Sequence, residues 1–243
     1  NIKPYLNEKT KLLVFSSPCN PTGSVFNRQE LSDIASMVLQ HPGMFVIADE
    51  IYEHIRFEGE HISLASLPGM AERTVTVNGL SKGFAMTGWR LGYIGAPQWI
   101  ANACDKFQGQ VTSGTCSISQ RAAIAALDAD PAVVAPMVEG FNKRRLLMHT
   151  LLSDIPGVKV NLPQGAFYFL PDVSAYLGRK FGEQRMNDTV GLCHYLLFEH
   201  HVATVSGKAF GCDKSIRLSY AASEEQIIEA VKRLKKGLLS LQA

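Results

Sequence analysis

The fold is decided by the stretch TVTVNGLSKGFAMTGWRLGYIGA, residues 74–96. It begins with Thr74 to Val77, a short run rich in β-branched residues that is typical of a strand. A second apolar run, Leu91 to Ala96, indicates another strand. The residues between these runs include several small and polar ones, among them Lys82 and Arg90. Because ligands bind at the strand ends of open parallel sheets, this connection is a candidate binding loop.

Two more strand ends lie upstream of this stretch. Lys11 to Ser16 is apolar and ends at Ser-Pro-Cys-Asn-Pro-Thr-Gly, where the prolines and the glycine stop a regular element. Phe45 to Ala48 has the pattern of a buried strand and ends at Asp49-Glu50. Between the two, Asn27 and Glu30 match the start of an amphipathic helix. Strand, helix and strand of this length predict a right-handed parallel crossover.

The second half of the chain has a different order of predicted helices and strands. Helices are expected at about 99–107, 119–127 and 132–153, strands at 158–161 and 166–170, a helix at 188–199, a strand at 215–219 and a capped helix at 223–241. We therefore expect residues 1–131 to form the C-terminal portion of a large domain, 132–153 a bridging helix and 154–243 a small domain. The predicted fold class is α/β, with a mostly parallel central sheet covered by helices on both faces and a smaller α+β C-terminal domain.

Composition narrows the classes of function. The chain has 243 residues, 46% of them hydrophobic and 19% charged, which is ordinary for a globular protein. Its formal charge of +2 comes without a long run of either sign, so small-molecule partners are expected, not nucleic acid or a membrane. Five scattered cysteines without a C-x-x-C pair argue against a disulfide framework or a structural zinc, and they favour a reducing, cytoplasmic setting.

The start of the chain is unusual. It begins Asn1-Ile2-Lys3-Pro4, without a methionine, and enters a predicted strand almost at once. We expect it to be the C-terminal part of a longer protein. No basic-then-apolar signal segment and no apolar run of about 18 residues is present, so no membrane span is expected.

Taken singly, each polar residue has an ordinary structural explanation. Asp49 could cap a strand end, Arg90 and Arg217 could be surface residues, and a lone Lys82 is usually a solvated side chain. Their order and spacing are more informative than any one of them.

Four segments resemble, in order, the motifs of the class I and II aminotransferases, pyridoxal-phosphate enzymes of fold type I. They are Asn20–Gly23 (NPTG), Asp49–Tyr52 (DEIY), Ser81–Gly92 (SKGFAMTGWRLG) and Ser215–Ser219 (SIRLS). The resemblance covers the whole chain, and within the family the sequence is most similar to bacterial aspartate-type members. It implies the fold-type I architecture with the N-terminal part absent.

The resemblance also implies roles for the residues that match the family motifs. Lys82 would hold pyridoxal 5′-phosphate as a Schiff base and later move a proton on the substrate. Asp49 would keep the pyridine nitrogen protonated, and Asn20 and Tyr52 would donate hydrogen bonds to the phenolic oxygen. Arg90 would bind the phosphate, for which a planar bidentate cation is suited.

The remaining implied contacts concern the substrate and the phosphate. Arg217 would bind the substrate α-carboxylate, with Asn20 beside it. Family members often carry a serine three residues before the lysine, and this chain has Gly79 there, so Ser81 is the candidate for the phosphate contact. The family's chains are longer at the N-terminus by on the order of 150 residues, far more than loop variation allows.

The implied reaction is transfer of an α-amino group from an amino acid, aspartate or a similar dicarboxylic donor, to a 2-oxo acid by a two-stage ping-pong mechanism. A homodimer is implied as well. β-Lyases, decarboxylases and cyclopropane-forming synthases share these motifs and stay open as alternatives, as does a non-catalytic aminotransferase-like binding module.

Two other patterns carry less weight. Gly79 to Gly83 satisfies G-x-S-x-G, so Ser81 could be a hydrolase nucleophile with Asp188 and either His194 or His200. That interpretation leaves the other motif residues unexplained. His200-His201 with Cys193 does not provide three or four converging ligands, so no metal is expected.

Overall fold

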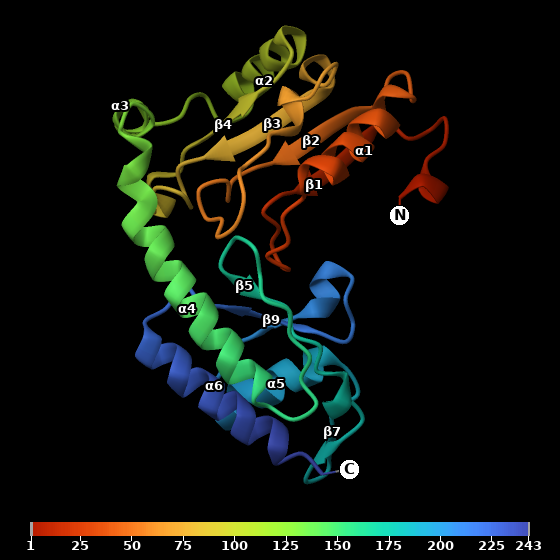
Figure 1. Ribbon diagram of the computed structural model, residues 1–243, viewed down its shortest axis with the longest axis vertical. Helices are drawn as coiled ribbons and strands as arrows, with labels where there is room; N and C mark the ends of the chain where they lie inside the picture. Colours follow the sequence, from red (N-terminus) through yellow and green to blue (C-terminus); the bar gives the residue numbers. More distant parts are fainter. Residues whose placement is uncertain (1, 243) are drawn as a thin grey trace. The chain divides into compact units, whose positions relative to one another are not determined.

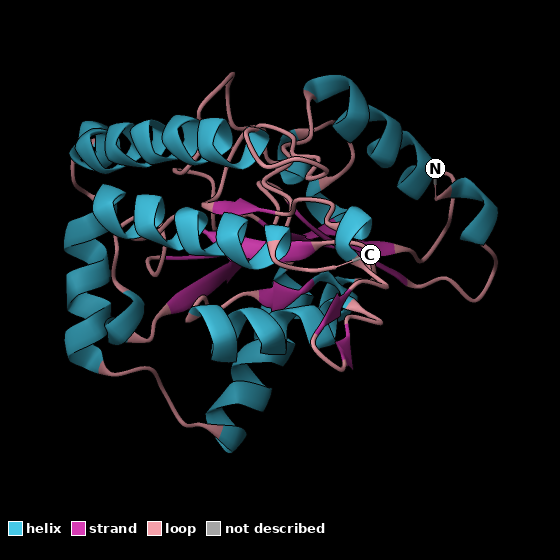
Figure 2. Ribbon diagram, turned by 90° about the horizontal axis from the view of Figure 1, so that it is seen from below, coloured by secondary structure: helices cyan, strands magenta, loops and turns pink. Residues whose placement is uncertain are grey.

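The computed structural model describes residues 2–242, and the chain divides into two compact units. Unit 1 consists of Asn1–Cys19 and Ser24–Pro136, and unit 2 of Asn20–Gly23 and Met137–Ala243. Figure 2 shows the helices, strands and connecting loops of the chain, and both units contain elements of each kind. Each unit has its own sheet, and we describe the units separately.

Unit 1 is built on a four-stranded sheet (Figure 1). Its strands are β1 (Leu12–Ser16), β2 (Phe45–Asp49), β3 (Thr74–Gly79) and β4 (Gly92–Gly95), and they lie in that order. β1 pairs with β2 and β2 with β3 in parallel, whereas β3 and β4 are antiparallel. The predicted α/β class with a mostly parallel sheet is therefore confirmed. Because β4 runs the opposite way, its start lies at the edge where β2 and β3 end.

The first helix, α1 (Arg28–Leu39), forms where its capping signal predicts it. Asn27 Oδ1 accepts a hydrogen bond from Glu30 N at 3.0 Å, and Glu30 Oε2 accepts one from Asn27 N at 2.8 Å. Leu31, Ala35 and Val38 on one helix face pack into a buried cluster with residues of β2 and of the segment that follows it. The helices α2 (Gln98–Val111) and α3 (Ser117–Leu127) complete this unit.

Unit 2 contains three helices and short strands. After a short 3₁₀ turn at Pro131–Val134, α4 (Ala135–Ser153) leads into this unit, and α5 (Thr189–His200) packs against α6 (Glu224–Leu239). The sheet has the order β5 (Tyr168–Phe169), β9 (Ile216–Ser219), β8 (Val205–Ser206), and a hairpin pairs β6 (Lys180–Phe181) with β7 (Gln184–Arg185). The predicted capping box between Ser223 and Gln226 starts α6.

One strand prediction in unit 2 was wrong, and another was too long. In the expected strand at 158–161, only Lys159 pairs, forming an isolated bridge with Asp172. The expected strand at 166–170 is reduced to β5, because Ala166 has a φ of 55°, which no strand residue adopts. The sequence analysis did not predict β6, β7 or β8, which are two residues each and too short to show a period.

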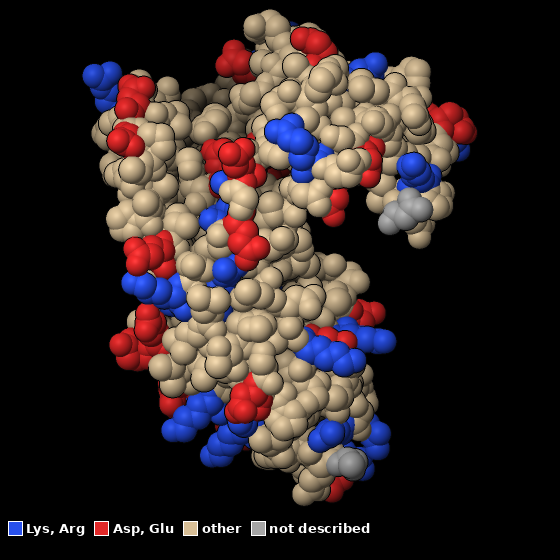
Figure 3. All heavy atoms as spheres, viewed as in Figure 1, with Lys and Arg blue, Asp and Glu red and all other residues tan. Residues whose placement is uncertain are grey.

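Charged side chains of both signs are interspersed over the face drawn in Figure 3. Within residues 2–242, no helix combines the length and the apolar character that crossing a membrane requires.

Candidate functional site

Asp49 is the last residue of β2 and is half-buried at the carboxyl edge of the sheet in unit 1. Its Oδ1 accepts a hydrogen bond from Ile51 N at 3.1 Å, which fixes the carboxylate over the first turn after the strand. Its Oδ2 has no hydrogen-bond partner among the described residues. A carboxyl group with one oxygen held and one available is suited to pair with an N–H cation.

Tyr52 and Lys82 are brought together at this edge. Tyr52 is only 3% exposed, and Lys82 Nζ lies 5.9 Å from the centroid of its ring. Lys82 follows β3 by three residues and is half-buried, so its amine lies against the phenol ring. A lysine in such a place is better suited to covalent chemistry than one extended into solvent.

Arg90 precedes β4 and is exposed, with its backbone in the left-handed region at a φ of 53°. Its Nη1 donates to Thr87 O at 3.0 Å, which folds the side chain back over the turn. A non-glycine residue in this conformation costs about 1 kcal/mol or more, and such residues cluster at functional sites. Ser81 is half-buried, and its hydroxyl makes no hydrogen bond within residues 2–242.

The glycine that replaces the serine of the family pattern has a structural reason. Gly79 pairs with Gly92 across β3 and β4. A Cβ on Gly79 would lie 3.0 Å from Gly92 Cα and 3.0 Å from Leu91 O, both backbone atoms. The two strands therefore approach too closely here for a serine without a backbone shift.

Unit 1 also has a polar network that the sequence analysis did not identify. Glu50 is 4% exposed, and its Oε2 lies 2.8 Å from His61 Nε2. Glu53 Oε1 accepts from Asn78 Nδ2 at 2.7 Å. The first pair is separated by 11 residues and the second by 25, so no local pattern reports either. The network joins the segment that carries Tyr52 to the end of the strand that precedes Lys82.

The same network affects neighbouring groups. His54 contacts the ring of Phe84 at 5.2 Å, and a Cβ on Gly83 would lie 2.5 Å from His54 Cδ2, so this imidazole covers the backbone next to Lys82. Burial raises the pKa of Tyr93, and the negative charges of Glu53 and Glu50 raise it further.

Three groups of the network are of residue types that bind metal ions. The ligand atoms of Glu50, Glu53 and His61 lie within 4.8 Å of one another. His61 is within 2.8 Å of Glu50 and 3.9 Å of Glu53, so these side chains are paired with each other. Mutual pairing explains the arrangement without an ion.

Asn20 and Arg217 are brought together in unit 2. Arg217 lies on β9, and its Nη1 donates to Asn20 Oδ1 at 2.9 Å. The turn that carries Asn20 is held at Gly23, whose carbonyl accepts from Gln164 N at 2.8 Å and from Gly165 N at 2.9 Å. Gly23 has a φ of 69°, and a Cβ there would lie 2.4 Å from Pro163 Cβ, so only glycine fits.

The aromatic environment of Arg217 was not predicted. Its guanidinium carbon lies 4.7 Å from the ring centroid of Tyr168 and 5.0 Å from that of Phe210. Among the described residues, no carboxylate pairs with it, and the bond to Asn20 is the one hydrogen bond that its guanidinium makes. A half-buried cation of this kind still has several N–H donors for an anionic ligand.

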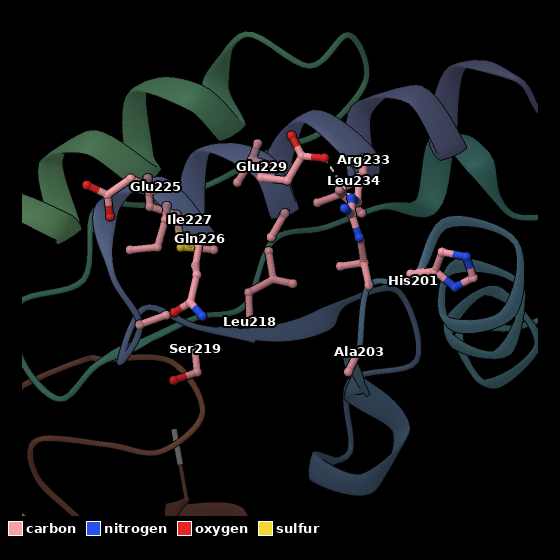
Figure 4. Close-up of a pocket in the computed structure, with 15 residues that line it drawn as sticks. His201, Ala203, Leu218, Ser219, Glu225, Gln226, Ile227, Glu229, Arg233 and Leu234 are labelled. Atoms are coloured by element: carbon pink, nitrogen blue, oxygen red, sulfur yellow. Dashed lines mark hydrogen bonds and ion pairs between the residues drawn. The ribbon is translucent and has the colours of Figure 1, made fainter.

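A separate pocket of about 630 Å³ opens in unit 2 beside α6 (Figure 4). Glu225, Gln226, Glu229 and Arg233 of α6 line it together with Leu218 and Ser219 of β9, and Arg233 Nε is paired with Glu229 Oε1 at 2.8 Å. None of the seven predicted site residues is part of its lining. The pocket is therefore not the candidate site.

The residues of the Ser81 hydrolase hypothesis have structural roles in unit 2. Asp188 Oδ1 caps α5 by accepting from Gly191 N at 2.8 Å. His200 Nε2 lies 2.9 Å from the hydroxyl of Tyr195, and burial lowers the pKa of His200. His194 contacts the ring of Phe198. These contacts explain the three residues without a catalytic triad.

The family model described as aminotransferase class I and II matches residues 1–234. A bifunctional aspartate aminotransferase and glutamate/aspartate-prephenate aminotransferase of Petunia hybrida is 51% identical over 246 residues, covering 99% of this chain and 51% of that protein. An aspartate/prephenate aminotransferase of Nitrosomonas europaea is 39% identical, covering 96% of this chain and 60% of the relative. The chain thus spans between half and three-fifths of the length of these relatives.

The solved structures that this chain resembles are also aminotransferases. The aspartate aminotransferase of Rhizobium meliloti matches with a TM-score of 0.95 at 35% identity, over 99% of this chain and 61% of that one. An aromatic aminotransferase of Pyrococcus horikoshii matches with a TM-score of 0.89 at 39% identity, over 98% and 62% of the two chains.

Proposed function

Since the chain belongs to the class I and II aminotransferases, we propose that the whole protein is a pyridoxal-phosphate-dependent aminotransferase. It moves an α-amino group from aspartate or a similar dicarboxylic donor to a 2-oxo acid. The observation that carries the proposal is the half-buried Lys82 amine lying 5.9 Å from the ring of the buried Tyr52, next to the strand end that carries Asp49.

The donor chemistry of unit 1 fits pyridoxal 5′-phosphate. When bound, the cofactor supplies an electron sink for charge that develops at the substrate Cα. Asp49 would hold a proton on the pyridine nitrogen through its available oxygen. Tyr52 would donate to the phenolic oxygen, and Arg90, with Ser81 as the second candidate, would bind the phosphate.

Lys82 has two proposed tasks, both at Nζ. It would anchor the cofactor covalently until an amino acid replaces it, and the released amine would then carry a proton to and from the substrate Cα. The polar network of Glu50, His61, Glu53 and Asn78 would hold the two segments that bear Tyr52 and Lys82 in register.

Arg217 would bind the substrate α-carboxylate, and Asn20, which already accepts from its Nη1, would orient the guanidinium. Asn20 would also contribute to cofactor and substrate binding from the Asn20–Gly23 turn. Support comes from the absence of a carboxylate partner for Arg217 among the described residues.

The choice of acceptor is a finer part of the proposal. Three relatives, among them those of Petunia hybrida and Nitrosomonas europaea, carry prephenate, a 2-oxo acid, in their names besides aspartate. We therefore include prephenate beside 2-oxoglutarate and oxaloacetate as acceptors to assay. β-Lyase or decarboxylase chemistry would release ammonia or carbon dioxide instead of leaving the amino group on the cofactor.

We further propose a homodimer in a reducing compartment such as the cytoplasm. The five cysteines are all free, which fits such a compartment. For the domains we propose a large-domain portion at 1–131, a bridging helix at 132–153 and a small domain at 154–243. Sedimentation of the full-length protein would measure the dimer directly.

The proposal is tested by absorbance of the full-length protein with pyridoxal phosphate, before and after adding aspartate. We expect a visible band that needs Lys82, is lost in Lys82→Ala and is replaced by the absorbance of the amine form when aspartate is added. Lys143→Ala is the matched control, since Lys143 is exposed and paired with Glu139.

The outcomes separate the hypotheses. A Lys82-dependent band that does not convert with any amino donor, or that converts with loss of ammonia, would replace aminotransfer by another reaction of the same cofactor. If Lys82→Ala and the parent protein gave the same spectrum, the cofactor assignment would be wrong and a binding module would be the better description.

A further inference from the structure

Arg217 lies in the middle strand of a three-stranded sheet, with an aromatic ring supplied from each side. β9 pairs with β5 on one side and with β8 on the other. Tyr168 comes from β5, and Phe210 ends the short helix at Gly207–Phe210 that directly follows β8. The two rings lie 4.7 Å and 5.0 Å from the guanidinium carbon.

The position of Phe210 is fixed by backbone contacts at the start of its helix. Gly207 N donates to Ser215 O at 2.7 Å, and Gly207 O accepts from Cys212 N at 2.9 Å. A Cβ on Gly207 would lie 2.3 Å from Cys212 O, so the two backbone segments are too close for any residue but glycine. Because this turn is closed so tightly onto the residues before β9, the backbone that carries Phe210 is held next to the strand of Arg217.

Tyr168 is fixed equally well on the other side. It is 7% exposed and is paired in register with Ser219, two residues after Arg217 on the same strand. The face of a tyrosine or phenylalanine ring attracts a guanidinium and favours a parallel, stacked arrangement. Two rings and one hydrogen bond to Asn20 therefore restrict the guanidinium from three directions.

We propose that Tyr168 and Phe210 are positioning residues that hold the guanidinium of Arg217 in one orientation for a substrate carboxylate. This inference rests on the proposed function and adds two residues to it. An arginine that is already ordered loses less side-chain entropy when its ligand arrives, so its ligand binds more tightly. The rings thus act on carboxylate affinity and not on the chemical step.

The primary test is Phe210→Leu, because Phe210 is only half-buried and a leucine keeps most of its apolar contact. We expect the Kd for succinate, measured by calorimetry on the cofactor-free and the cofactor-loaded full-length protein, to rise about three- to tenfold. The KM for aspartate should rise in parallel while kcat stays within about twofold. Phe210→Tyr, which keeps a ring, should retain the parent Kd.

Controls separate positioning from general loss of structure. Phe198→Leu is the matched control, since Phe198 is 69% exposed on α5. Binding of ethylamine, which is alanine without its carboxylate, should be the same in Phe210→Leu and in the parent. Tyr168→Phe should be neutral, and Tyr168→Leu should repeat the effect of Phe210→Leu.

A double-mutant cycle gives the decisive result. Lysine has no planar group to stack, so Phe210→Leu should change the succinate Kd by less than about twofold when Arg217 is replaced by lysine. An equal loss in both backgrounds, or a Phe210→Leu variant that binds succinate like the parent, would overturn the inference. If Arg217→Ala itself left the succinate Kd unchanged, the proposed carboxylate site would be wrong. That result is distinguishable from a failure of the positioning inference, in which Arg217→Ala still weakens succinate binding.

Discussion

Gly79 shows how one residue without a side chain shapes the edge of the candidate site. It lies opposite Gly92, and a Cβ would meet two backbone atoms at 3.0 Å. We expect Gly79→Ser to lower the free energy of unfolding by about 1–3 kcal/mol, because inserting atoms into a closed contact forces the strands apart. Urea unfolding would measure this change.

Gly88→Ser is the control for that substitution, because a Cβ on Gly88 would meet nothing within 4 Å. It should change stability by no more than about 0.5 kcal/mol. Should the two variants be equally stable, β3 and β4 can separate without cost, and the glycine would need another explanation.

Single residues of the candidate site could be predicted to different degrees. Asp49, Tyr52, Lys82 and Arg90 could be singled out because they follow or precede runs with a strand pattern and match family motifs in order. The partners of Arg217 could not, because Tyr168 and Phe210 meet it only through the pairing of β5, β9 and β8. The alternation of side chains along a strand predicts which residues share a face, but it does not predict which strand pairs with it.

Asp172 stabilises the region where the predicted strand at 158–161 did not form. Its Oδ1 accepts from Ser174 N at 2.7 Å, and its backbone forms the isolated bridge with Lys159. Hydrogen bonds from Ser174 lower the pKa of this carboxyl below its ordinary 3.8. Because the pKa of Asp172 is lower in the folded protein than in the unfolded chain, its carboxylate stabilises the fold at pH values above 3.8. This stabilisation is lost as the pH falls through the lower pKa of the folded state.

We therefore expect Asp172→Asn to lower the free energy of unfolding at pH 7 by about 1 kcal/mol. The difference from the parent should shrink as the pH drops below 3.8. Urea unfolding across this range, with Asp105→Asn on the exposed face of α2 as control, would measure it. A difference that stays constant with pH would mean that the charge of Asp172 contributes nothing.

Elements with local signals were predicted well. The capping boxes that start α1 and α6 and the apolar runs of β1, β2 and β3 all formed where the sequence placed them, although β1 is partly exposed. The errors lie in unit 2, where β5, β6, β7 and β8 are two residues long. Such strands exist because neighbouring segments pair with them, so tertiary contacts decide them and propensity does not.

The sheet of unit 1 has two open edges. Among the described residues, β1 pairs with β2 alone and β4 with β3 alone, and Val14 of β1 is 62% exposed. Unpaired edges with apolar side chains favour edge-to-edge association. We expect the 243-residue chain to self-associate beyond a dimer with rising concentration, and Val14→Lys to reduce this, as measured by sedimentation velocity.

Ile228→Lys provides the comparison, since Ile228 is 47% exposed on α6 and lies on no strand. It should leave the association of the chain unchanged. An equal reduction by both lysines would point to net charge instead of the sheet edge.

The turn at Asn20–Gly23 belongs to unit 2, although the rest of that unit begins at Met137. Asn20 and its partner Arg217 are 197 residues apart. At the usual speed of synthesis, roughly 10 to 40 s pass between the appearance of Asn20 and that of Arg217 on the ribosome. During that interval the strand before the turn and the helix after it can already fold. The proposed carboxylate site is then completed only when β9, the last strand, emerges.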